Sequence, residues 1–337
     1  MSDLRERVAA YLAEHPDAGR RTIVREFSVS DRAAMEALRA AKRAAPVAQQ
    51  VATTPPSDIA EVWQEVIRRQ ERLARKRAEL RATERRIILP SEPCGIAHMS
   101  DLHTGASGTD YKTMHADAVL IRDTPGLFAA FGGDGTDNWI VTKLQKLQRS
   151  QIVDFDDEWE LFKDLVLMLR RKWKWILSGN HDLWSDSMAG VDRLGELVRE
   201  LRVLYGRHEV FFELQHGTTM RRVKARHKWR GNSIFNPTHG LEVGWDRGDD
   251  DYDWAIGGHT HIGTLCRPFY RHGKRRYAYL IGTYKQEDEH GDAIGFPSPK
   301  GRGCGVTLLH PDGRQWWFDE VAEGAEFLAW LRQKAGV

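Results

Sequence analysis

The strongest constraint on the fold of this chain is a series of strand-like apolar runs that each end in Asp, Asn or His beside a glycine. CGIAHMS precedes Asp101 and His103, GLFAAFGG precedes Asp134, KWILSG precedes Asn180 and His181, and YDWAIGG precedes His259 and His261. Functional groups of open α/β sheets cluster beyond the carboxyl ends of the strands. The pattern therefore predicts an α/β fold that brings these side chains together.

The chain from residue 87 onward alternates strand-like and helical segments. Helices are expected over 111–123, from Trp139 to about Lys172, and over 189–202. Beyond Tyr205 the sequence is rich in strands, with HPDGR as a hairpin turn. We expect two packed sheets with helices outside them, in a domain of residues 87–320 that a short amphipathic helix, 321–337, follows.

The first 45 residues predict a small all-α domain that resembles a helix-turn-helix unit. Two helices are separated by the turn Ser28–Ser30, with Ser30 as the cap of the later helix. The expected core residues are Ile23, Val24, Phe27, Val29 and Leu38. The last helix of such a unit lies in the major groove, which makes Arg32 and Arg39 candidates for DNA contact. Ser28 stands where such units usually have glycine, and the alternative is a three-helix bundle that binds protein or nothing.

Two segments connect this domain to the rest. Residues 46–57 have the small, polar, proline-containing composition of a linker. Residues 58–86 predict a charged helix with apolar residues seven apart, but the paired positions that a coiled coil needs are polar from Arg69 onward. We therefore expect a helix docked along its own domain, with a dimeric rod as the alternative; the sequence does not determine the oligomeric state.

Composition excludes some classes of protein. No apolar run approaches the ~18 residues of a membrane span, and the charged N-terminal residues lack the apolar core of a signal peptide. Three widely spaced cysteines predict no disulfide framework, so we expect a cytoplasmic protein with no membrane partner. Residues 1–86 carry 18 Lys and Arg against 13 Asp and Glu, whereas the remainder carries 32 against 35. The basic N-terminal part favours a nucleic-acid partner.

The residue types at the strand ends predict a metal site. Residues two apart on a strand face the same way, so Asp101 and His103 supply a carboxylate and an imidazole together. These ligands suit divalent manganese, iron or zinc, and we expect manganese. The strand ends together supply more ligands than one tetrahedral ion can bind, but two ions that share a carboxylate would use them. Two-metal sites clamp the attacking and leaving oxygens in phosphoryl transfer, which favours phosphate-ester hydrolysis.

The series DLH, GDGTDN, GNHD, a later histidine and GGHTH resembles the calcineurin-like metallophosphoesterase superfamily, whose pattern is D-x-H, GD, GNH[D/E], H and GH-x-H. The resemblance covers residues of roughly 94–310. The stretches GNHDLW, ARHKWRGNSIFNPTHG and LIGTYKQED are similar to metallophosphoesterases encoded by bacteriophages and their bacterial hosts. Some of those enzymes also carry an N-terminal helix-turn-helix. The resemblance implies a two-sheet metallophosphoesterase sandwich flanked by helices.

The resemblance also implies roles for individual residues. One metal ion would be held by Asp101, His103, Asp134 and His261, and the other by Asp134, Asn180, His227 and His259. A hydroxide between the ions would attack phosphorus. His181 would protonate the leaving alkoxide or steady the phosphoryl oxygens, and Asp182 would orient His181.

The middle histidine of the pattern has two candidates. His227 follows the strand-like TMRRVKAR, and His239 lies in NPTHG. The strand context favours His227 as the ligand, and His239 is then a candidate for contact with substrate or with a ligand's second nitrogen. His98, inside the strand before Asp101, is expected to be a packed core histidine.

Departures from the family pattern narrow the range of expected substrates. Ser/Thr protein phosphatases of this superfamily have phosphate-binding arginines where this chain has Asn138-Trp139 and Asp182-Leu183. The pattern is more similar to the phosphodiesterase and nuclease branches, and Asn138 is a further candidate for contact with substrate or for support of a metal ligand. We expect a DNA-directed phosphodiesterase. The alternatives are a small-molecule nucleotide phosphoesterase and a DNA-binding regulator whose metal site is structural.

Overall fold

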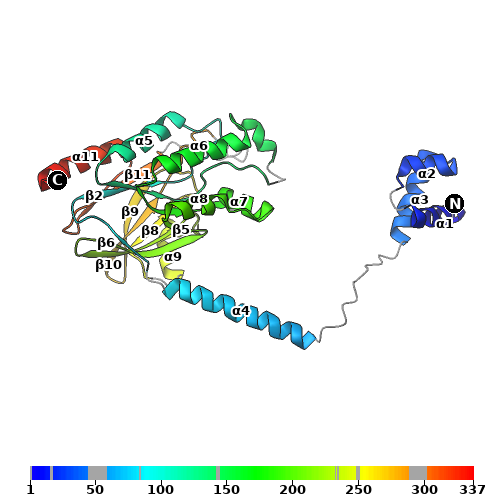
Figure 1. The fold of residues 1–337 in the computed structure, drawn as a ribbon, viewed down its shortest axis with the longest axis horizontal. Helices are drawn as coiled ribbons and strands as arrows, with labels where there is room; N and C mark the ends of the chain where they lie inside the picture. The colour runs from blue at the N-terminus through cyan, green and yellow to red at the C-terminus, as the bar shows by residue number, and fades with distance from the viewer. Residues whose placement is uncertain are drawn as a thin grey trace. The chain divides into compact units, whose positions relative to one another are not determined.

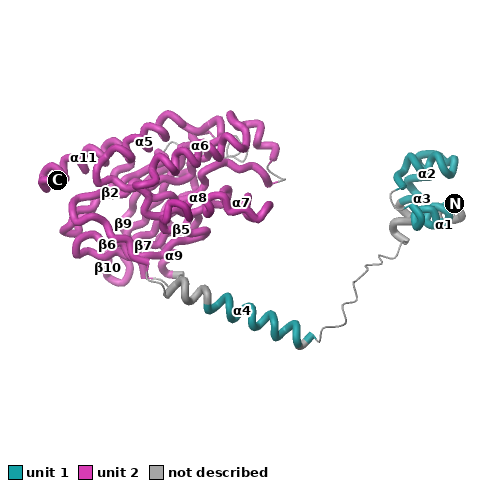
Figure 2. The backbone as a smooth tube through the Cα atoms, viewed as in Figure 1, with its two compact units in different colours: residues 1–82 teal, residues 83–337 magenta. Residues whose placement is uncertain are grey.

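A computed structural model describes residues 2–15, 18–44, 59–82, 85–141, 145–231, 233, 235–247, 251–287 and 302–337. The predicted linker, 46–57, lies outside the described residues. The chain divides into two compact units, residues 1–82 and 83–337 (Figure 2). No helix in the described ranges is both long enough and apolar enough to cross a membrane.

The first unit contains three short helices and one long helix: α1 (Ser2–Glu14), α2 (Arg20–Phe27), α3 (Asp31–Ala44) and α4 (Ile59–Ala82). Val8, Ile23, Ala34 and Ala37 form the core of the short helices, and the residues predicted for this core lie in it or pack against it. Ser28 has φ 51°, the left-handed conformation that favours glycine. The amide of Ala33 donates to Oγ of Ser30, which confirms Ser30 as a cap. A helix-turn-helix role stays a prediction.

The second unit contains two six-stranded sheets (Figure 1). The first sheet has the order β12 (Gln315–Phe318), β11 (Cys304–Leu309), β2 (Cys94–Met99), β3 (Leu127–Phe131), β4 (Trp173–Leu177) and β5 (Leu204–Gly206). Its strands β2 to β5 are parallel. All six residues of β2 are buried, as expected for a central strand covered on both faces.

The second sheet has the order β1 (Arg86–Ile88), β6 (Glu209–His216), β7 (Thr219–Arg226), β8 (Trp254–Gly257), β10 (Lys274–Leu280) and β9 (Leu265–Arg271). The strands β7, β8 and β10 are parallel. Buried residues alternate along β6, because one face of this strand packs inward. The predicted α/β architecture of two packed sheets is therefore confirmed.

The helices in the described part of this unit are α5 (Tyr111–Asp123), α6 (Phe155–Met168), α7 (Asn180–Ala189), α8 (Arg193–Leu201), α9 (His239–Arg247) and α11 (Val321–Ala335), with a 3-10 helix, η1 (Gln145–Ser150). In Figure 1, α5, α6 and α11 lie together over the first sheet, where a large apolar cluster forms. A second cluster fills the space between the sheets, and α9 covers the outer face of the second sheet. The sandwich with outer helices is thus built around these buried layers.

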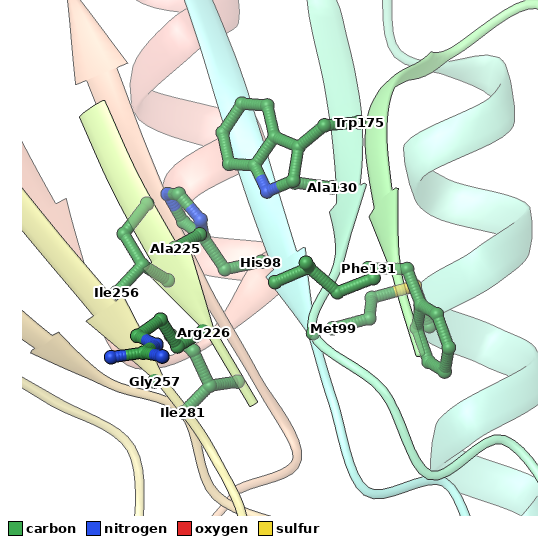
Figure 3. Close-up of a pocket in the computed structure, with 12 residues that line it drawn as sticks. His98, Met99, Ala130, Phe131, Trp175, Ala225, Arg226, Ile256, Gly257 and Ile281 are labelled. Atoms are coloured by element: carbon green, nitrogen blue, oxygen red, sulfur yellow. The ribbon is translucent and has the colours of Figure 1, made fainter. Parts of the chain in front are cut away.

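His98 lies in the layer between the sheets, as the sequence predicts for a core histidine. Figure 3 shows its ring near Trp175 and Ile256, around a cavity of about 10 Å³. The ring is 1% exposed and its Nε2 lies 3.0 Å from Oγ1 of Thr307. Burial lowers the pKa of His98 to about 3, so this side chain is a neutral packing residue.

One predicted helix is much too long. In the described part of the segment from Trp139 to about Lys172, the helices are η1 and α6, because Asp154 caps a new helix by accepting from the amides of Asp156 and Asp157. The amide of Ile152 bonds to the carbonyl of Gly105, which ties the preceding residues to the loop after β2. Helices α7 and α9 and strand β9 were not predicted.

Candidate metal centre

The predicted ligands lie just beyond the carboxyl ends of five strands. Asp101 and His103 follow β2, Asp134 follows β3, Asn180 follows β4, His227 follows β7, and His259 and His261 follow β8. Because β2, β3 and β4 are parallel in one sheet and β7 and β8 are parallel in the other, these residues gather at one edge of each sheet. Short distances between them show that the two edges meet.

Asp101, His103 and His261 form one group that could hold a metal ion. Nε2 of His261 lies 3.0 Å from Oδ1 of Asp101 and 3.1 Å from Nε2 of His103. Atoms bound to one ion at ~2.0–2.2 Å lie about this far apart. Asp101 is fully buried and His103 is 2% exposed, whereas the side chain of His261 is 21% exposed, so the group lies where the buried interior meets solvent.

Asp134, His227 and His259 form the second group. Nε2 of His227 lies 2.9 Å from Oδ2 of Asp134, and Nδ1 of His259 lies 3.3 Å from Nε2 of His227. His227 donates through Nδ1 to the carbonyl of Gly132, which leaves Nε2 directed at the group. Of the two candidates for the middle histidine, the structure brings His227 into the cluster.

His239 lies elsewhere. It begins α9 and is half-buried, and none of the described groups of metal-ligand type includes it. Its predicted contact with substrate stays untested.

Asn180 supplies a test of whether the site fits a metal. Its Oδ1 is buried and has no hydrogen-bond partner among the described residues. An unsatisfied buried oxygen costs about 1–3 kcal/mol, and a divalent cation would satisfy it. Together with the carboxylates and imidazoles, this oxygen makes a donor set of the kind that manganese, iron and zinc accept.

The backbone at the predicted ligands is strained. Asp101, His103, Asp134, His259 and His261 all have φ between 48° and 70°, the left-handed region that non-glycine residues seldom adopt. Each such residue costs of order 1 kcal/mol or more. Hydrogen bonds hold the conformation, since the amides of Leu102 and His103 both donate to the carbonyl of Asp134. Strain concentrated at one cluster indicates a functional site.

Two glycines allow the carboxylates to approach the backbone. A Cβ on Gly179 would lie 2.0 Å from Oδ1 of Asp134, and one on Gly258 would lie 2.4 Å from Oδ2 of Asp101. The glycines before Asn180 and His259 are therefore required by the close packing of the two carboxylates.

The charges of the cluster shift its pKa values. Burial alone would raise the pKa of Asp101, but the charge of His227 and the hydrogen bond with His261 outweigh it and lower the value to about 2. Burial would lower the pKa of His227, but the charges of Asp134 and Asp101 raise it to about 10. Burial, reinforced by the charge of His227, lowers the pKa of His259 to about 4. The carboxylates are thus held ionised, the state in which they bind cations.

His181 begins α7 beside the second group. Its Nδ1 donates to the carbonyl of Asp137 over 2.5 Å, and its Nε2 lies 4.0 Å from Oδ2 of Asp134. Trp184 and Trp139 pack around the ring, with centroid distances of 4.1 and 4.9 Å. Burial lowers the pKa of His181 to about 4. The ring is fixed with one nitrogen facing the cluster.

Asp182 is placed differently from its prediction. Its carboxylate accepts hydrogen bonds from the amides of Asp134, Gly135 and Gly179, at 2.8–3.0 Å. It therefore clamps the loops after β3 and β4 to each other, and no described hydrogen bond joins it to the His181 ring. Burial and the charge of Asp134 raise the pKa of Asp182 to about 7.

Asp137 is a residue that sequence reasoning missed. Its Oδ1 accepts from Nδ1 of His103 at 2.7 Å and lies 3.4 Å from Nζ of Lys285, and its Oδ2 accepts from Nε1 of Trp139 at 3.0 Å. A carboxylate on the second nitrogen of a ligand histidine fixes the ring orientation and its tautomer. Its place in GDGTDN was a signal for Asp137, and the stretch LIGTYKQED, which contains Lys285, was a signal for the lysine.

The remaining predicted residues are not among the candidate metal ligands. Asn138 donates to the carbonyl of His181 and to Oγ of Ser185, so it anchors the start of α7. The backbone N–H of Asn138 donates to the buried carboxyl of Glu158. Arg32 is exposed on α3, whereas the side chain of Arg39 lies outside the described residues. DNA contact by either arginine stays a prediction.

Comparisons with known proteins found no matching family and no matching curated protein. Among solved structures, vacuolar protein sorting 29 from Cryptosporidium parvum is 17% identical, with 67% of this chain and 96% of that chain covered and a TM-score of 0.36. The calcineurin-like phosphoesterase YfkN from Bacillus subtilis is 13% identical, with 73% and 97% covered and a TM-score of 0.37. Chaetomium thermophilum Vps29 is 11% identical, with 66% and 93% covered and a TM-score of 0.33. Similarity at this level assigns no activity to the chain.

Proposed function

We propose that this chain is a metal-dependent phosphoesterase of the calcineurin-like type that hydrolyses phosphodiester bonds, with DNA as its substrate. The observation that carries the proposal is two of the three described Asp/His groups at the meeting strand ends, Asp101–His103–His261 and Asp134–His227–His259, completed by the unsatisfied Oδ1 of Asn180. The third group, His103, Asp137 and His181, shares His103 with the first. The motif resemblance supports the same chemistry independently of the geometry.

The residues would divide between two ions. Asp101, His103 and His261 would hold one ion and Asn180, His227 and His259 the other, with Asp134 available to both. When bound, such ions polarise a phosphoryl oxygen and make a nucleophile available at neutral pH. Asp137 keeps His103 oriented with Nε2 toward its ion, because it accepts the proton of Nδ1.

His181 moves a proton at Nε2, because its Nδ1 is committed to the carbonyl of Asp137. Burial favours the neutral ring. A negatively charged phosphoryl group beside the ring would favour the imidazolium form, which can give its Nε2 proton to the departing alkoxide. Asp182 acts indirectly, since it holds the two loops that carry Asp134 and His181.

Three features support a DNA substrate. The chain lacks arginines at the positions where protein phosphatases of this superfamily bind phosphate, and has Asn138-Trp139 and Asp182-Leu183 there. Residues 1–86 carry a net positive charge. The three N-terminal helices, with an exposed Arg32 on α3, are the arrangement expected of a helix-turn-helix unit.

The substrate is tested with the full-length chain and Mn²⁺ on single-stranded DNA, double-stranded DNA, mononucleotides and cyclic nucleotides. The Asp134→Asn variant is the control for contaminating nucleases. DNA cleavage that requires Mn²⁺ and is absent in the variant supports the proposal. Hydrolysis of nucleotides without cleavage of DNA would replace it with the small-molecule alternative.

A further inference from the structure

A second site lies at the opposite ends of the strands from the metal centre. It is a cleft of about 450 Å³, within the range of small-ligand sites. Its walls come from β7, β8 and β10 of one sheet and from β12 and the preceding turn of the other. The residues that line it are Met220, Arg221, Asp253, Trp254, Arg275, Tyr277, Gly313, Arg314, Gln315 and Trp316.

The cleft is far from the metal centre. Arg221 lies near the start of β7, whereas His227 follows the end of the same strand. Six residues of extended chain span roughly 20 Å at ~3.3 Å per residue. Trp254 and Arg275 likewise lie at the starts of β8 and β10, which are parallel to β7. A ligand in this cleft would not touch the metal ligands.

Three arginine–aromatic pairs line the cleft. The guanidinium carbon of Arg221 lies 5.7 Å from the ring centre of Trp254. The distance from Arg275 to Tyr277 is 5.2 Å, and that from Arg314 to Trp316 is 5.5 Å. Guanidinium groups placed over aromatic rings keep their N–H edges available for planar anions such as phosphate. Trp254 is buried beneath Arg221, whereas Tyr277 is half-buried and presents ring surface. The ring of Trp316 packs edge-on against Phe327 of α11, with 5.6 Å between the ring centroids.

The positive charge of the cleft is only partly neutralised. The one carboxylate in the lining, Asp253, already accepts from Nη1 of Arg276 at 2.9 Å and from the amide of Arg222 at 2.8 Å. Arg314 pairs with Asp312 at 2.7 Å. Within the described part of the chain, neither Arg221 nor Arg275 has an ion pair within 4.0 Å. Two cationic groups therefore remain for a ligand.

Arg221 adds an independent observation. It is 8% exposed, and its Nη2 donates to the carbonyl of Gly313 at 2.7 Å. Its Nη1 is buried and has no hydrogen-bond partner among the described residues. A buried N–H group without an acceptor is costly, and a charged donor more so. An anionic oxygen in the cleft would supply the missing acceptor after a small movement of the side chain.

From these observations we propose that the cleft binds a nucleotide. Arg221 and Arg275 donate to its phosphate, and its base stacks on the ring surface of Tyr277. The nucleotide is either free or part of a single-stranded nucleic acid, since both present a base and a phosphate. This site is separate from the metal centre and does not depend on the proposed hydrolysis.

The proposal is tested by calorimetric titration of the full-length chain with AMP, with a single-stranded oligothymidylate and with inorganic phosphate. A chelator is present throughout, so that neither metal-mediated binding nor hydrolysis contributes. Arg275 is exposed, so its replacement is not expected to prevent folding. Arg275→Ala should weaken binding of AMP or of the oligothymidylate, whichever binds the wild type more tightly, at least about 10-fold. Tyr277→Leu should weaken binding of AMP but leave binding of inorganic phosphate unchanged.

Lys274→Ala is the matched control. It removes the same charge from the neighbouring position of β10, whose side chain points to the other face of the strand, and it should bind as the wild type does. Tighter binding of AMP identifies a free nucleotide as the ligand, and tighter binding of the oligonucleotide identifies a single strand. No binding of either, equal weakening by Lys274→Ala and Arg275→Ala, or phosphate binding as tight as AMP would overturn the proposal.

Discussion

Nε2 of His227 lies 2.9 Å from Oδ2 of Asp134, although the two residues follow strands of different sheets. This contact closes the metal centre across the sandwich. We expect His227→Ala to lower the amount of bound metal and to reduce hydrolysis by more than about 100-fold, because loss of an outer-shell partner alone costs 10–100-fold. His239→Ala, the matched control, should retain its metal. Metal content measured by mass spectrometry distinguishes the two histidines. Loss of metal in His239→Ala with retention of metal in His227→Ala would give the ligand role to His239.

The contacts of His181 predict a separation of metal binding from turnover. Its Nε2 faces the cluster but lies 4.0 Å from the nearest carboxylate oxygen, that of Asp134. His181→Ala should therefore retain both metal ions and lose about 10²–10⁴-fold in kcat, the range of general acid catalysis. If the metal content falls with kcat, His181 is a ligand rather than a proton donor.

Asp182 is expected to matter for stability. Asp182→Ala would leave the buried amides of Asp134, Gly135 and Gly179 without their acceptor. At about 1–3 kcal/mol for each unsatisfied group, the free energy of unfolding should fall by at least about 3 kcal/mol in urea denaturation. Asp164→Ala, on the exposed face of α6, should change it by less than about 0.5 kcal/mol. Equal effects of the two substitutions would refute the clamp.

The buried carboxyl of Glu158 is expected to make the stability of the protein depend on pH. Burial raises the pKa of its carboxyl from 4.5 to about 8. Between these values the folded protein holds a proton that the unfolded chain has released, so Glu158 makes the free energy of unfolding fall as the pH rises from 4.5 to about 8. Glu158→Gln should reduce this fall in urea denaturation at several pH values. An unchanged slope would show that the carboxyl is ionised in the folded protein.

Much of the centre follows from local sequence because each ligand is next to a strand end and a glycine. Gly179 and Gly258 are the positions where a carboxylate packs against the backbone, and such approaches restrict the sequence enough to be recognised. Asp137 escaped prediction because its role depends on His103 and Lys285, which contact it only in the folded chain.

The errors in secondary structure have the same origin. Residues 145–154 have helical composition, but they form only the 3-10 helix η1, and a hydrogen bond from Ile152 to Gly105 ties the segment after η1 to another loop. Strand β9 contains Pro268 and lies at the edge of its sheet, where proline is tolerated but weakens the local signal. Helix α7 begins within the GNHD motif, whose residues were interpreted for chemistry alone.

The central claim is that the Asp/His cluster binds metal ions that hydrolyse phosphodiesters. The most direct test is hydrolysis of bis-p-nitrophenyl phosphate by the wild type and by Asp134→Asn, with and without added Mn²⁺, with bound metal measured in the same samples. The account predicts Mn²⁺-dependent hydrolysis that falls more than about 100-fold in the variant, together with reduced metal content and an unchanged circular dichroism spectrum. Hydrolysis at the wild-type rate in Asp134→Asn, or metal-loaded wild type without activity on this ester, would contradict it.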